Sequence, residues 1–137
     1  MITLTAAGAS LSNFAPGNTA TGSGTLTATD TDSPSWTLQA QDVGSGSGKM
    51  VASAAGCAGS SPTLDNALRL SISGTLSGVT YTPAIGLSAA NQTVASATNA
   101  SMLAPTTFTP NYVQVIPATQ AMLTGCVYTI TVTYTLQ

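Results

Sequence analysis

The feature that most constrains the fold of this chain is an alternation of residue classes with a period of two. It is clearest in five segments, residues 25–32, 36–41, 68–73, 112–116 and 127–136. Successive side chains of a strand point to opposite faces, so the alternation predicts strands with one face turned toward a core. No segment of comparable length has apolar residues at helical spacing, and we therefore expect little or no helix.

Turn-forming residues separate the alternating segments. Clusters of glycine, proline, serine and asparagine stand at residues 15–18, 32–35, 44–48, 59–62 and 104–111. Short strands interrupted this often predict an all-β fold, namely an antiparallel β-sandwich of Ig-like or Greek-key-like type. With 137 residues the chain is long enough for one hydrophobic core and too short for two of ordinary size, so residues 1–137 should form a single domain.

The composition excludes several classes of function. Only 4% of the residues are charged, and histidine is absent. Two basic residues cannot neutralise a row of phosphates, which argues against nucleic-acid binding. Without histidine the chain has no Ser-His-Asp or Cys-His catalysis and none of the commonest zinc sites. Lys49 follows G-S-G-S-G, but the spacing of a phosphate-binding loop is not met. We expect no enzyme.

The chain has the composition of an exported surface protein. No apolar run approaches the length needed to cross a bilayer, and no signal peptide is visible after Met1. We expect an extracellular protein from which a signal peptide has been removed. The two cysteines, Cys57 and Cys126, then predict a disulfide closing about 70 residues, worth roughly 4 kcal/mol. The alternative is a pair of buried free thiols.

The only tryptophan of the chain is on the apolar face of its segment. Alternation puts Trp36, Leu38 and Ala40 on one side, and Thr37 and Gln39 on the other. Burying an indole removes about 200 Å² from water, worth several kcal/mol, so Trp36 is predicted to lie in the core. The alternative is an exposed ring that stacks on a carbohydrate.

Two carboxylates in D-T-D-S suggest a cation site. Asp30 and Asp32 have part of the spacing of a calcium loop, but the further ligands and the distal glutamate of an EF-hand are missing. A loosely held calcium at Asp30 and Asp32 is therefore one hypothesis, and a solvated turn leading through Pro34 is the other. No other cofactor is expected.

Two short motifs resemble a known family. T-A-T-D-T-D-S-P-S-W-T-L, residues 27–38, and a C-terminal strand in which Tyr128 precedes Tyr134-Thr135-Leu136 are similar to the two motifs of the WxL domain of bacterial surface proteins. The resemblance covers residues 25 to 137, with Tyr134 standing where the family has tryptophan. It implies non-covalent attachment to the cell wall, peptidoglycan as ligand and other surface proteins as partners. The candidate binding residues are Trp36, Leu38, Tyr134 and Leu136.

Two functions therefore stand as hypotheses. The first is a non-enzymatic, WxL-like module that attaches an exported protein to the cell wall. The second is a structural subunit of an extracellular appendage or surface layer, which self-associates by pairing edge strands. The first is the leading hypothesis. The long alternating C-terminal segment and the nearly uncharged surface also suit the second, because charges are a usual device against edge-to-edge association. A carbohydrate-binding module that uses Trp36 or the tyrosines as a stacking platform is a third, weaker hypothesis.

Overall fold

The computed structural model describes residues 1–52, 63–122 and 126–137, and these ranges contain strands and no helix. This confirms the all-β prediction. The described residues form twelve strands: β1 (Ile2–Ala6), β2 (Thr19–Ser23), β3 (Leu26–Asp30), β4 (Trp36–Asp42), β5 (Val51–Ala52), β6 (Arg69–Gly74), β7 (Val79–Tyr81), β8 (Ile85–Gly86), β9 (Gln92–Ala97), β10 (Met102–Val115), β11 (Tyr128–Thr129) and β12 (Val132–Leu136).

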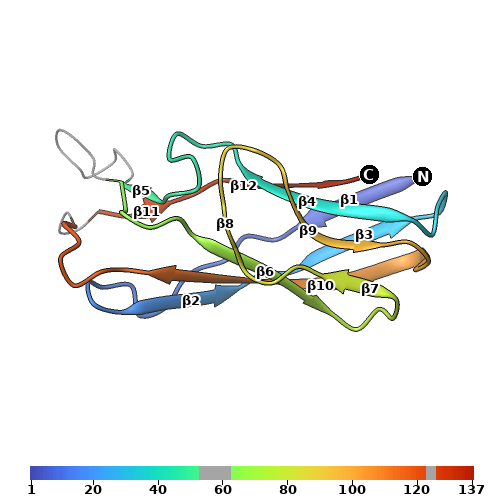
Figure 1. Ribbon diagram of the computed structural model, residues 1–137, viewed down its shortest axis with the longest axis horizontal. Helices are drawn as coiled ribbons and strands as arrows, with labels where there is room; N and C mark the ends of the chain where they lie inside the picture. The colour runs from blue at the N-terminus through green and yellow to red at the C-terminus, as the bar shows by residue number, and fades with distance from the viewer. Residues whose placement is uncertain (53–62, 123–125) are drawn as a thin grey trace.

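The strands form two main antiparallel sheets packed face to face (Figure 1). Sheet A has the order β1-β3-β10-β6-β8, and β2 also pairs with β10. Sheet B has the order β12-β4-β9-β7, and a small third sheet pairs β11 with β5. One edge of sheet A, β1, lies beside one edge of sheet B, β12, and the two chain ends are close together (Figure 1).

The core lies between sheets A and B. Its side chains are the inward-facing members of the alternating segments: Leu26 and Ala28 from β3, Trp36, Leu38 and Ala40 from β4, Leu70 and Ile72 from β6, Val94 and Ala97 from β9, Phe108 and Tyr112 from β10, and Leu136 from β12. The burial pattern of β4 alternates at every residue. A period-two sequence thus places its apolar residues between the sheets.

One predicted loop is instead the middle of the longest strand. Residues 104–111 contain two prolines, yet they belong to β10. Pro110 is buried opposite Ile72 of β6, and its carbonyl accepts a hydrogen bond from Gly24 on the other side. The nitrogen of Pro110 therefore faces the short break between β2 and β3, where β10 changes partner. The missing N–H falls where the ladder is already interrupted, so the strand tolerates the proline.

The C-terminal alternating segment, expected as one strand, is divided into β11 and β12. The strands that pair with this segment explain the division. β12 pairs with β4 as far as Asp42, and β11 pairs with β5 from Val51 onward. Between these two partners the chain makes an excursion through residues 43–50. The segment therefore changes from one sheet to another at residues 130–131.

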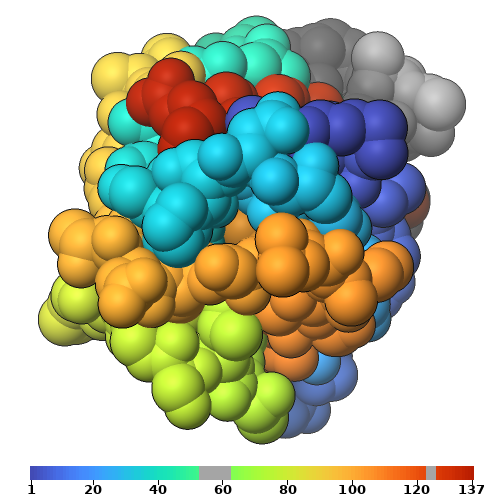
Figure 2. Space-filling view, turned by 90° about the vertical axis from the view of Figure 1, so that its right-hand side faces the viewer, coloured from blue at the N-terminus to red at the C-terminus, as the bar shows by residue number. Residues whose placement is uncertain are grey.

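Figure 2 looks at the end of the sandwich where the two termini lie. It shows the C-terminal residues in red against the blue and cyan residues of β3, β4 and their connection. The backbones of Thr37 and Gln137 exchange two hydrogen bonds at this end, and Met1 accepts one from the N–H of Thr31. The first and last strands are thereby held to neighbouring strands of the two sheets.

Candidate functional site

The two aromatic-Thr-Leu triplets, which lie about 100 residues apart in the sequence, are on adjacent strands. β12 pairs with β4 in antiparallel register, with Leu136 opposite Leu38 and Tyr134 opposite Ala40. The residues that the sequence singled out therefore share the inner face of sheet B. The structure places Trp36 and Tyr134 at different points along the strand pair, so the two rings face different partners across the core.

Trp36 is buried, as predicted, with 2% of its surface exposed. Its indole N–H donates a hydrogen bond of 2.7 Å to the carbonyl of Ala100. Its ring meets that of Phe108 in sheet A edge to face, with centroids 5.8 Å apart. Leu38 and Leu136 are buried as well. These three side chains join the two sheets, and none of them is placed to contact a ligand directly.

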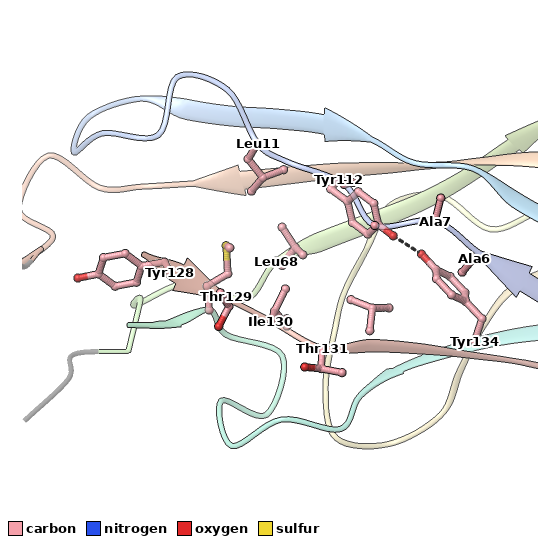
Figure 3. Close-up of a pocket in the computed structure, with 14 residues that line it drawn as sticks. Ala6, Ala7, Leu11, Leu68, Tyr112, Tyr128, Thr129, Ile130, Thr131 and Tyr134 are labelled. Atoms are coloured by element: carbon pink, nitrogen blue, oxygen red, sulfur yellow. Dashed lines mark hydrogen bonds between the residues drawn. The ribbon is translucent and has the colours of Figure 1, made fainter. Parts of the chain in front are cut away.

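Tyr134 makes a polar contact between the two sheets. Its hydroxyl lies 2.6 Å from that of Tyr112 in β10 (Figure 3). Burial raises the pKa of both phenols, and the contact with Tyr112 raises the pKa of Tyr134 further. Both tyrosines are therefore neutral hydrogen-bonding groups at any physiological pH, and neither is an activated nucleophile.

The two acidic residues of the suggested calcium site have different surroundings. Asp30 is buried, and its Oδ1 accepts hydrogen bonds from the backbone N–H groups of Asp32 and Ser33. Asp32 is exposed and forms an ion pair with the amino group of Met1. Within the described ranges, no group of three or more histidine, cysteine or acidic side chains is arranged to hold a metal ion. Asp30 acts here as the cap of a turn.

The other sequence predictions concern the cysteines and the membrane. Cys126 is disulfide-bonded, and Cys57 lies outside the described residues. No helix in the described part of the chain is long and apolar enough to cross a membrane.

Sequence reasoning missed a groove between the N-terminal and C-terminal segments. Beyond Ala6, the chain after β1 diverges from β11 and β12 and leaves a cavity of about 380 Å³ (Figure 3). Tyr112 and Tyr134 lie in its wall, and none of the described residues that line it is charged. The lining comprises Ala6, Ala7, Gly8, Ala9, Leu11, Met50, Leu68, Tyr112, Tyr128, Thr129, Ile130, Thr131, Val132 and Tyr134. We call it the β1–β12 groove. No local motif marks it, because its two walls are far apart in sequence.

The outer face of sheet B was also not singled out by the sequence motifs. Since the apolar members of both triplets point inward, the middle residues, Thr37 and Thr135, point outward. Opposite Thr135 lies Gln39, whose amide oxygen accepts a hydrogen bond from the side chain of Gln137. The hydroxyl and amide groups of this face come from β4, β9 and β12: Thr37, Gln39, Gln41, Thr93, Ser96, Thr133 and Thr135.

Comparisons with known proteins give no match for this chain. No protein-family model matches the chain, and searches of curated proteins and of solved structures also give no match.

Proposed function

We propose that the protein is a non-enzymatic module of a bacterial cell surface, similar to the WxL domain, which attaches non-covalently to peptidoglycan in the wall. The observation that supports this best is the pairing of the two triplets on β4 and β12. The two motifs share one residue pattern and lie far apart in the sequence, yet they are on neighbouring strands. Two motifs that act together in one domain need to lie side by side in this way.

The burial of the triplets assigns their apolar residues a structural role in this proposal. Trp36, Leu38 and Leu136 hold sheet B in place, and the outer threonines present the binding surface. A flat row of hydroxyl and amide groups suits a glycan, because a sugar offers hydroxyl donors and acceptors along its whole length. The lack of charge on this row also avoids the cost of desolvating an ion when the glycan docks.

A sedimentation assay with purified peptidoglycan tests the proposal. The protein should pellet with the sacculi, and replacing the two outer threonines, Thr37→Val with Thr135→Val, should reduce the bound fraction. Valine keeps the shape and the strand preference of threonine, so the fold should survive. The matched control is Thr27→Val with Thr107→Val, a cross-strand pair of sheet A. Equal binding by both double variants would remove the outer face of sheet B from the proposal, and no binding by the parent protein would refute wall attachment.

A structural subunit that assembles by strand pairing is the second candidate. β7 is an outermost strand of sheet B, on the side away from β12, and it contains neither a charged residue nor a proline. These are the usual devices that keep edge strands apart. Under this candidate, concentrated protein should form filaments visible by electron microscopy. A constant monomer mass in light scattering at all concentrations would refute it.

A further inference from the structure

The β1–β12 groove adjoins a second cavity and forms one elongated hollow with it. The second cavity has a volume of about 400 Å³. Figure 3 shows Tyr112 and Tyr134 at one end of the groove and Tyr128 at the other, with Leu68 and Ile130 between them. The lining residues common to both cavities are Ala9, Leu11, Met50, Tyr128 and Thr129. The hollow therefore extends away from the tyrosine pair.

The lining of this hollow is uncharged. The chain has two basic and four acidic side chains, and none of them is among the residues that line either cavity. The part of the groove beside the tyrosine pair is formed largely by aliphatic side chains, including Leu68, Ile130 and Val132. An ionised ligand would lose its water there without gaining a counter-charge, whereas a hydrocarbon would gain by leaving water.

The tyrosine pair has one hydrogen-bond donor left over. Two phenols carry two O–H groups, and the contact between Tyr112 and Tyr134 uses only one of them. No other described group accepts a hydrogen bond from either hydroxyl, although Tyr112 is only 8% exposed. A donor placed so deeply in an aliphatic groove favours a ligand that brings an acceptor oxygen.

From these observations we propose that the β1–β12 groove binds a small, neutral, elongated ligand that is mostly hydrocarbon and carries one acceptor oxygen, such as an acyl chain in an ester or ketone. The oxygen accepts a hydrogen bond from the Tyr112–Tyr134 pair, and the chain lies along Leu68 and Ile130. The volume of the groove is within the range of small-molecule sites, about 300–1,000 Å³. A sugar fits less well, because its many hydroxyl groups would face aliphatic side chains unpaired. This site is separate from wall attachment at the outer face of sheet B and does not depend on it.

The test titrates 2-octanone into the full chain labelled with ¹³C at its methyl groups and follows the titration by NMR. We expect shifts at the methyl groups of Leu68 and Ile130. Octanoate has the same number of carbons but is charged at neutral pH, so it should bind at least about tenfold more weakly. An N-acetylglucosamine oligomer should leave these methyl groups unshifted.

A double variant tests the hydrogen bond to the ligand. Tyr112→Phe with Tyr134→Phe removes both hydroxyls and leaves neither one unpaired, so the fold should survive. It should weaken the binding of 2-octanone about two- to tenfold. Either single variant keeps one donor for the ligand and should weaken binding less. The matched control is Tyr81→Phe, which removes a buried hydroxyl that bonds no described group and lies outside the groove lining. It should leave the affinity unchanged.

A second variant tests the location of the site without touching the tyrosines. Ala6 lines the groove and lies opposite the buried Leu26, so its side chain faces inward. Ala6→Leu would fill part of the groove and should weaken binding about fourfold for each methylene of 2-octanone that it displaces. The control, Thr5→Leu, makes a bulky change at the neighbouring, outward-facing position of β1.

Several outcomes overturn the proposal. These are an absence of shifts at Leu68 and Ile130 with 2-octanone, equal binding of octanoate, and equal affinity of the folded double tyrosine variant. Unchanged binding by Ala6→Leu, or equal weakening by Thr5→Leu, would place the ligand elsewhere and overturn it too. Shifts at these methyl groups with the N-acetylglucosamine oligomer but not with 2-octanone would assign the groove to a glycan. Failure of the protein to pellet with sacculi would refute wall attachment and leave this site standing.

Discussion

Replacing Trp36 with phenylalanine tests the central role given to this residue in joining the sheets. The change keeps an aromatic ring against Phe108 but removes the indole N–H, which leaves the carbonyl of Ala100 without its 2.7 Å hydrogen bond. A buried acceptor left unpaired costs about 1–3 kcal/mol. The smaller ring also loses roughly 40 Å² of buried area, or about 1 kcal/mol. We therefore expect a loss of about 2–4 kcal/mol in the free energy of unfolding.

Guanidinium unfolding followed by far-ultraviolet circular dichroism measures this loss. The slope of the transition should stay unchanged, because the variant exposes the same surface on unfolding. In the parent protein, the emission of Trp36 should shift to longer wavelength on unfolding. A loss below about 0.5 kcal/mol, which is typical of surface positions, would refute the buried hydrogen bond. A native emission maximum equal to that of the denatured chain would refute the burial itself.

Three further predictions concern other parts of the sandwich. Gly48→Ala should unfold or strongly destabilise the protein in thermal melts, because Gly48 has φ +96° and a Cβ there would come 1.8 Å from the carbonyl of Leu87. Stability should fall as the pH rises above about 10, because the unfolded phenols ionise there whereas burial holds the pKa of Tyr112 and Tyr134 higher in the fold; Tyr134→Phe should flatten this decline in alkaline melts. Reducing the disulfide at Cys126 should raise the intact mass by two daltons and lower the unfolding free energy by roughly 4 kcal/mol.

The fold was predictable where apolar and polar residues alternate regularly along a strand. In β4 every second residue is buried, so the position of Trp36 followed from the pattern alone. The pattern failed where tertiary context decided the outcome. The prolines of residues 104–111 indicated a loop, but the partner change beside Pro110 makes a missing N–H harmless. Local sequence carries no information on where a neighbouring ladder is interrupted.

The candidate site was only partly accessible to sequence reasoning. The two triplets could be paired by their shared pattern, and the structure brings them together. The sequence could not show which of their residues are exposed to a ligand, nor that Tyr112 from β10 completes a contact with Tyr134. The groove depends on how two distant segments diverge after β1 and before β12. Such a feature arises from packing and has no local signature.

The acidic residues show how this chain uses its few charges. Asp30 and Asp42 are both buried at the ends of strands. Each accepts backbone N–H groups from the turn that follows, in the case of Asp42 from Gly44 at 2.8 Å and from Gly48 at 2.7 Å. Bonds of this kind to an ionised carboxylate are stronger than those between neutral groups. These two of the four carboxylates thus stabilise turns and lie away from the surface that a partner would meet.

This use of charge predicts how binding responds to salt. With two basic and four acidic residues in the whole chain, and two of the acidic ones buried, the surface offers little field to attract or repel a partner. Contacts at the outer face of sheet B would rest on neutral hydrogen bonds, which salt screens weakly. We expect the affinity for sacculi to change less than about twofold between low and physiological ionic strength. A steep decline with salt in this titration would show that charged groups carry the binding, which would contradict the proposed role of the outer face of sheet B.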